Sequence, residues 1–415
     1  MAQGLAAAPR VPTFAALQNT NFRVYFIGQL ISTSGTWMQN VALGYLVFQL
    51  TQSELMLGIV ACAAGIPMLL IAPFAGVIVG RMPRQRVLLL TQIGMMLPAF
   101  ALVLLVITDS VQVWLLLLLA LWQGAVNAFD APARQIFIAD LIDNAHLPSG
   151  IAMNSMIING SRVFGPALAG VLLLTLGAAW CFLLNGLSFL FVIGTLALIQ
   201  LGDAPQAAGR AQPLAELRAG LQYVRGHSVV LPLLMLSSSG GFSGWALLAL
   251  LPAFADEVLK SPEEGYAIIS AANGFGSVVA GLLVGYLGHR IGRGRVLLSM
   301  GVLVGVAMAM LSQMTSIPAA AAANFVLGFA TISFLVTVNT SVQLTIPNAM
   351  RGRVMSLYTL TIIGLNPFGA LLLGVLAEAT SNPTALLIYA AAFTLVCALV
   401  FTRYPQVRRI GLAEL

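Results

Sequence analysis

The feature that most constrains the fold is a short basic motif that occurs twice. It has the form Gly-x-x-x-x-Arg-x-x-Arg-x-Arg, and each copy is followed by an apolar run. The copies begin at Gly76 and Gly285, about half of the 415-residue chain apart. A basic loop between long apolar stretches, placed alike in both halves, predicts two copies of one membrane-embedded unit.

Composition supports a bilayer as the surrounding solvent. Hydrophobic residues make up 59% of the chain, charged residues make up 8%, and the mean hydropathy is +0.96. A soluble protein carries about 25% charged residues. The net charge of +6 comes from short basic clusters between apolar runs, so membrane topology explains it better than nucleic-acid binding. Residues 1–14 lack the apolar core of a cleavable signal peptide.

Twelve stretches are long enough to cross the hydrocarbon core, which takes roughly 20 mainly apolar residues. Six fall in each half: 23–48, 56–79, 87–107, 111–131, 151–175, 178–201, 229–255, 265–288, 296–314, 318–344, 354–379 and 384–403. We therefore expect an all-α polytopic membrane protein with twelve transmembrane helices in two six-helix pseudo-repeats. The domains are predicted as an N-terminal bundle over 1–201, a cytoplasmic linker over 202–228 and a C-terminal bundle over 229–415.

The linker contains a predicted amphipathic helix that begins at Pro213. Leu214, Leu217, Leu221 and Val224 form one apolar stripe along it. A helix lying at the lipid headgroups is one interpretation, and a regulatory docking site is the other.

The distribution of basic residues predicts the orientation. With the N-terminus in the cytoplasm, the arginine clusters of the loops fall inside and the sole lysine, Lys260, falls outside. Positive charge is retained in cytoplasmic loops, so both termini are expected in the cytoplasm.

Several local motifs resemble the major facilitator superfamily. They are the repeated basic loop, Gly165-Pro166-Ala-Leu-Ala-Gly170, Asn21-Phe22-Arg23 leading to Gly28-Gln29, Gly35-Thr36-Trp37-Met38-Gln39, Phe129-Asp130-Ala-Pro132-Ala-Arg134-Gln, and Arg351-Gly-Arg353-Val-Met-Ser. The last four resemble the branch that contains the enterobactin exporter and macrolide efflux proteins. This resemblance implies the major facilitator fold, alternating access, function as a monomer and a place in the bacterial cytoplasmic membrane. It also implies that spans one, four, seven and ten line a central cavity.

Two positions depart from the pattern that the resemblance implies. Such loops carry an Asp before the first Arg, whereas this chain has Gly80 and, in the second copy, His289. The arginine of multidrug antiporters is also missing from span four, where Ala120, Leu121 and Trp122 stand. These departures weaken an inference of proton coupling by analogy. Without a carboxylate latch at Gly80, we expect the closed cytoplasmic face to be less favoured and the inward-facing state more populated.

The candidate gating set consists mainly of arginines and glycines, together with Pro166, His289 and Asp130, an acidic residue within a predicted span. Asp130 is expected to pair either with Arg84 or, four residues along its own helix, with Arg134. Arg162 lies deep in span five beside Gly165-Pro166, which interrupts the helix pattern; it either bonds to opened backbone carbonyls or contacts a gate or substrate. The full set is Gly76, Gly80, Arg81, Arg84, Arg86, Asp130, Arg134, Arg162, Gly165, Pro166, Gly170, Gly285, His289, Arg290, Arg293 and Arg295.

Polar and aromatic residues recur on one face of three of the four spans expected to line the cavity. The candidates are Gln29, Ser32, Thr36, Trp37, Gln39, Asn40, Trp122, Gln123, Asn127, Trp245, Asn324, Thr331 and Asn339. For each residue the alternative is a hydrogen bond between helices. Such a wall suits amphipathic, largely uncharged ligands.

Missing motifs limit the energy source. A phosphate-binding loop needs a lysine, and Lys260 lies in a predicted outer loop; no metal or catalytic motif is present either. We therefore expect a secondary transporter that is neither an enzyme nor dependent on a cofactor or metal. The leading hypothesis is a proton-coupled multidrug exporter, with Asp130 as the one visible candidate for a coupling carboxylate. The alternatives are a dedicated exporter of a siderophore or lysolipid, and a non-transporting membrane receptor of the same fold.

Overall fold

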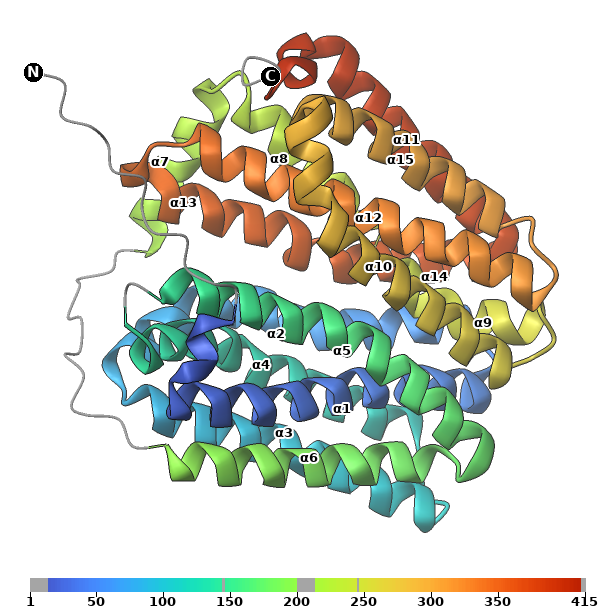
Figure 1. Cartoon of the computed structure of the whole chain (residues 1–415). Helices are drawn as coiled ribbons and strands as arrows, with labels where there is room; N and C mark the ends of the chain where they lie inside the picture. The colour runs from blue at the N-terminus through green and yellow to red at the C-terminus, as the bar shows by residue number, and fades with distance from the viewer. Residues whose placement is uncertain (1–13, 144–145, 200–212, 245, 412–415) are drawn as a thin grey trace, which may run out of the picture.

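The chain forms two stacked bundles of long helices (Figure 1). The computed structural model describes residues 14–143, 146–199, 213–244 and 246–411, and all regular structure within these ranges is helical. The first bundle holds α1 (Thr20–Thr51), α2 (Glu54–Arg81), α3 (Arg84–Ile107), α4 (Val113–Leu141), α5 (Leu147–Thr175) and α6 (Ala178–Leu198), preceded by the 3-10 turn η1 (Ala15–Gln18).

Local chemistry explains where these helices begin. The Asn19 side chain accepts a hydrogen bond from the Phe22 amide at the start of α1, and Ser53 does the same for Met56 at the start of α2. The helices match the predicted spans to within a few residues except α4, which continues to Leu141 rather than ending near 131. That extension includes Arg134, Gln135 and Asp140, so it does not continue the apolar run that marked the span.

The second bundle contains two broken spans. Span seven consists of α8 (Val230–Ser239), the π-helical turn η2 (Gly240–Gly244) and α9 (Leu247–Glu257), and span eleven of α13 (Asn348–Thr359), the π-helical turn η3 (Leu360–Gly364) and α14 (Asn366–Ala379). The others are α10 (Glu264–Ile291), α11 (Arg293–Leu311), α12 (Ile317–Thr345) and α15 (Asn382–Arg403), followed by η4 (Pro405–Arg409). A π-helical turn widens a helix locally and often marks a functional position.

Eleven spans in the described residues are long and apolar enough to cross a membrane. The remaining long helix is α1, which is 32 residues long but lies outside this group. Its buried Gln29, Ser32, Ser34 and Gln39 account for its lower hydropathy. These eleven spans together with α1 confirm the predicted all-α polytopic fold.

The amphipathic helix of the linker packs on protein. It is α7 (Pro213–Gly226), and it lies against α13 at the top left of Figure 1. A Cβ on Gly220 would lie 3.1 Å from the Arg353 carbonyl oxygen, and Val224 is 3% exposed. At least part of α7 is therefore held by the second bundle rather than by lipid. The side chains of Leu214 and Leu217, and linker residues 202–212, lie outside the described part.

The two bundles touch at the end of the molecule that is predicted to face outward. A Cβ on Gly58 of α2 would lie 2.8 Å from the Ala370 carbonyl oxygen on α14. On the other side of the molecule, a Cβ on Gly274 of α10 would lie 3.0 Å from the Val163 Cα on α5. Glycine is needed at both positions because the helix backbones approach so closely.

The same helices separate toward the predicted cytoplasmic end. A Cβ on Gly76 or Gly80 of α2, or on Gly281 or Gly285 of α10, would meet nothing within 4 Å. α2 and α10 are thus packed against the opposite bundle at one end and free of it at the other. With the predicted orientation, this arrangement is inward-facing.

Candidate functional site

A cavity of about 340 Å³ lies between the bundles. Its walls come from α1, α2 and α5 on one side and from η2, α9, α10, α12 and α14 on the other. This volume is within the range of small-molecule sites. Its polar and aromatic lining consists of Trp37, Asn40, Arg162, Tyr266, Ser270, Asn273, Ser277, Thr331 and Asn366.

Arg162 gives this cavity its charge. It is the charged side chain in the described lining, and its guanidinium lies over the Trp37 ring at 5.4 Å from the ring centroid. A cation over an indole face is stabilised by the ring quadrupole, so Trp37 orients the guanidinium. Arg162 therefore lies where a ligand would bind, whereas the sequence placed it in the gating set. The cavity is less suited to purely uncharged ligands than we expected.

Among the residues predicted to line a cavity, Trp37, Asn40 and Thr331 do so. Sequence reasoning missed Ser270, Asn273 and Ser277 of α10 and Asn366 of α14. The first three recur at helical spacing and so carry the signal that was used for span one. They were overlooked because span eight was not expected to line the cavity. Span four contributes nothing to it within the described residues, contrary to expectation.

Gln39 and Gln123 join helices instead. The Gln39 Nε2 donates to Gln123 Oε1 at 3.3 Å, and Asn185 Nδ2 donates to Gln39 Oε1 at 2.7 Å. Gln39 is 2% exposed, so this chain of amides connects α1, α4 and α6 inside the first bundle. Asn324 plays a similar part in the second bundle, where its Nδ2 donates to the Ile269 carbonyl at 2.8 Å.

The other predicted cavity residues lie elsewhere. Thr36 donates to the Ser32 carbonyl (3.0 Å), half-exposed Trp122 donates to the Gly94 carbonyl (2.7 Å), and Asn339 accepts from Gln343. Gln29 and Ser32 are buried in α1, Asn127 is exposed on α4, and none of the three lines this cavity; Trp245 lies outside the described residues.

These placements predict opposite results for two adjacent residues. Asn40→Ala removes a cavity amide, so it should alter transport while leaving the melting temperature unchanged. Gln39→Ala should lower stability by about 1–3 kcal/mol, because it removes the acceptor of the buried Asn185 Nδ2 and the donor to the half-buried Gln123 Oε1. Thermal unfolding in detergent and transport assays of both variants would check this. A stable Gln39→Ala protein with altered selectivity would contradict it.

Asp130 is buried within the first bundle. It is 1% exposed, forms an ion pair with Arg134, and accepts hydrogen bonds from Thr91 Oγ1 at 2.9 Å and Gln92 Nε2 at 2.8 Å. Arg134 also reaches Thr33 on α1. Of the two expected pairings, the local one is present and the one with Arg84 is wrong.

Arg84 pairs with a different carboxylate. Its Nη1 lies 3.2 Å from Asp140 Oδ2, and both side chains are largely covered. The longer α4 explains the error, because its last turn brings Asp140 to the start of α3. Gln85, also unpredicted, donates to the Leu196 and Ile199 carbonyls at 2.7 and 2.9 Å and so caps the end of α6.

The remaining loop residues of the gating set are mostly solvated. Arg81, Arg86, His289, Arg290 and Arg295 are exposed, and Arg293 is half-buried. Arg290 donates to Tyr286 Oη at 2.6 Å, on its own helix. Among the described residues, no carboxylate forms a salt bridge with Arg81, Arg86, Arg290 or Arg295.

The glycines of span five serve packing. A Cβ on Gly165 would lie 2.8 Å from the Ser34 carbonyl oxygen on α1, and one on Gly170 would collide with Ala267 on α10. α5 continues without a break through Pro166, and Pro166 itself lines the cavity. The predicted interruption of the helix at this point is wrong.

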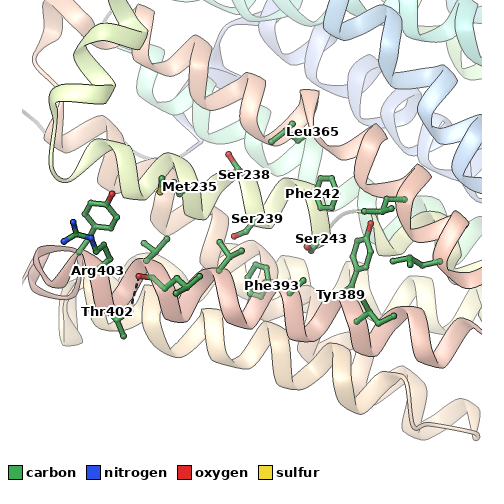
Figure 2. Close-up of a pocket in the computed structure, with 18 residues that line it drawn as sticks. Met235, Ser238, Ser239, Phe242, Ser243, Leu365, Tyr389, Phe393, Thr402 and Arg403 are labelled. Carbon is green, nitrogen blue, oxygen red and sulfur yellow. Dashed lines mark hydrogen bonds between the residues drawn. The ribbon is translucent and has the colours of Figure 1, made fainter. Parts of the chain in front are cut away.

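A larger groove of about 990 Å³ lies on one face of the second bundle (Figure 2). Its residues come from α8, η2, α14, α15 and the short segment that follows, and they are mostly apolar, with Ser238, Ser239 and Ser243 among them. None belongs to the first bundle, so the groove does not lie between the moving halves. The central cavity, although smaller, is the better candidate for a transport site.

The family model described as "Transmembrane secretion effector" matches residues 11–411. The chain belongs to this family of major facilitator transporters. It is 25% identical over 266 residues to the staphyloferrin A transporter of Staphylococcus aureus, covering 63% of this chain and 66% of that protein. It is 26% identical over 356 residues to the enterobactin exporter EntS of Shigella flexneri, covering 85% of this chain and 84% of that one. For YfiS, an uncharacterised transporter of Bacillus subtilis, identity is 28% over 48% of this chain and 47% of that protein.

Solved structures support the fold of this secretion effector. The nucleoside transporter NupG superposes with a TM-score of 0.72 at 15% identity, over 92% of this chain and 98% of that one. A bacterial homologue of the lysosomal transporter Spinster, solved inward-facing and unoccupied, gives 0.70 at 14% identity, over 95% and 98%. At such low identity the likeness shows the fold alone.

Proposed function

We propose that this secretion effector exports an acidic, oxygen-rich amphipathic molecule of the siderophore kind by alternating access. The observation that carries the proposal is the position of Arg162, which places one cation among amides, hydroxyls and aromatic rings in the cavity between the bundles. A guanidinium recognises carboxylate and similar oxygen anions through paired hydrogen bonds. Apolar wall residues would cover the rest of such a ligand.

Two further observations support this substrate class. The matched relatives include proteins named for exporting enterobactin and transporting staphyloferrin A. The bundles also part toward the predicted cytoplasmic end, because α2 and α10 lose contact with the opposite bundle there. A product made in the cytoplasm would enter from that side, and rocking of the bundles would then expose it outside.

Proton-coupled multidrug export is the second candidate. The wall is mainly apolar apart from Arg162, and aromatic surface from Trp37 and Tyr266 can accept varied ligands. In that case transport of neutral and cationic amphipaths would not depend on the guanidinium.

Substitution of Arg162 separates the two candidates. Arg162→Gln should lower export of enterobactin or staphyloferrin A by about 10- to 100-fold, since a charge-assisted hydrogen bond contributes about 1.5–3 kcal/mol. Arg162→Lys should retain part of the activity because it keeps the charge but loses the planar fork. Export from loaded proteoliposomes, with and without a pH gradient, measures both.

Arg409→Gln is the matched control, because Arg409 is exposed in η4, does not line the cavity and is outside the candidate gating set. It should leave export unchanged. If Arg162→Gln exports both siderophores normally, the proposed substrate class is wrong. If the wild type exports only neutral dyes, the multidrug candidate replaces it.

A further inference from the structure

Three glutamates and an asparagine meet where the two bundles join at the predicted outer end. Glu54 begins α2, Glu257 ends α9, Glu378 lies near the end of α14, and Asn382 begins α15. Asn382 Nδ2 donates to Glu54 Oε1 at 3.2 Å and to Glu257 Oε2 at 2.5 Å. The cluster therefore links the first bundle to the second.

Glu378 accepts hydrogen bonds of the kind that stabilise an ionised carboxylate. Ser53 Oγ and the Leu55 amide donate to its Oε2 at 2.9 and 3.2 Å, at the N-terminus of α2. Backbone donors and the positive end of a helix both favour a negative charge. A Cβ on Gly374, one turn earlier, would lie 2.5 Å from the Glu54 carbonyl oxygen, so α14 is pressed against this helix end.

Glu257 lacks such support, and Glu54, although it lies in the first turn of α2, is buried at the junction. Glu54 is 7% exposed, and neither carboxylate forms a salt bridge with a described cation. Glu257 lies at the C-terminal, negative end of α9, which disfavours an anion. The neighbouring charged groups are Asp256, Lys260, Glu263 and Glu264, of which Glu263 accepts a hydrogen bond from Tyr45 at 2.7 Å. Acidic groups thus outnumber cations around the junction.

The Asn382 side chain has one buried polar atom without a hydrogen-bond partner in the described structure. It is completely buried, and its Oδ1 has no hydrogen-bond donor in the described structure. An amide and a protonated carboxyl group satisfy each other, because the NH₂ donates to one carboxyl oxygen and the carboxyl O–H donates to the amide oxygen. A proton on Glu54, whose Oε1 accepts from Asn382 Nδ2, would give this pair of side chains a donor and would remove one of the repelling charges.

We propose that this cluster is a proton-binding site in which one proton on Glu54, beside Asn382, holds the outer face closed. The proton comes from the external water onto a carboxylate oxygen and returns to it when the bundles part. Loss of the proton leaves three carboxylates at the junction, and their repulsion favours the outward-facing state. This inference rests only on the alternating-access part of the proposed function.

Distances between spin labels on the outer ends test the site without any substrate. Labels at Ser110, between α3 and α4, and Gln313, between α11 and α12, are on exposed loops of opposite bundles. The buried native cysteines, Cys62, Cys181 and Cys397, would first be replaced. In nanodiscs, raising the pH from about 5 to about 9 should lower the closed-to-open ratio of the wild type by about tenfold or more, the effect of one pKa unit of coupling.

Glu54→Gln should keep the outer face closed across this range, since a neutral amide cannot lose a proton. Glu257→Gln should weaken the pH response, because it removes one of the charges that repel the Glu54 carboxylate. Glu264→Gln, an exposed carboxylate on the first turn of α10, is the matched control and should respond as the wild type does. A wild type with no pH response, or a Glu54→Gln variant with the full response, would overturn the proposal. Neither result would affect the Arg162 test, which depends on substrate rather than on pH-driven distances.

Discussion

Asp130→Ala is expected to be the most destabilising single substitution considered, at about 3–5 kcal/mol. It removes the carboxylate that neutralises Arg134 and the acceptor of the buried Gln92 amide, whereas Thr91 keeps its bond to the Leu88 carbonyl. A buried charge without its partner costs far more than the ion pair contributed. Thermal unfolding in detergent, followed by circular dichroism or tryptophan fluorescence, should show a large fall in melting temperature.

Two variants check the cause of that loss. Asp140→Ala breaks the pair with Arg84, whose carboxylate is less buried than Asp130 and accepts from fewer groups, and it should cost less, about 1–3 kcal/mol. Asp130→Leu combined with Arg134→Leu removes both charges and should recover most of the stability, because an apolar pair can replace a buried ion pair. If Asp130→Ala unfolds at the wild-type temperature, the pair is not structural and the hypothesis of Asp130 as a coupling carboxylate regains support.

Gly274→Leu is expected to abolish the outer-closed state. A Cβ at this position would lie 2.8 Å from the Arg162 carbonyl carbon and 3.0 Å from the Val163 Cα, so even the first carbon of a side chain forces α10 away from α5. The closed-to-open ratio at the outer face should fall by at least about 100-fold, the effect of roughly 3 kcal/mol of overpacking. The spin labels at Ser110 and Gln313 would report a shift to long distances, and transport would stop.

Gly281→Leu is the control on the same helix. A Cβ there meets nothing within 4 Å, so the variant should keep the wild-type distances. Equal distributions for Gly274→Leu and the wild type would mean that α5 and α10 do not form the outer closure.

The number of spans and their repeat follow from the sequence because they depend on local properties. A repeated basic loop and long apolar runs impose helices wherever backbone groups must be satisfied in lipid. The predicted limits agree with the structure for most spans, and α1 was recognised although its polar face lowers its hydropathy. Where charged residues interrupt the apolar run, as Arg134 and Asp140 do in the last turns of α4, the prediction ended too early.

The sites depend on the tertiary structure, because they are made by side chains from helices distant in sequence. Helical spacing identified the polar face of α1, but it could not separate Asn40, which lines the cavity, from Gln39, which faces α4 and α6. The sequence could also not pair Arg84 with Asp140, or bring Glu54 to Glu257. Those contacts depend on helix lengths and on how the two bundles pack, whereas hydropathy and spacing along a single helix report only which residues share a face.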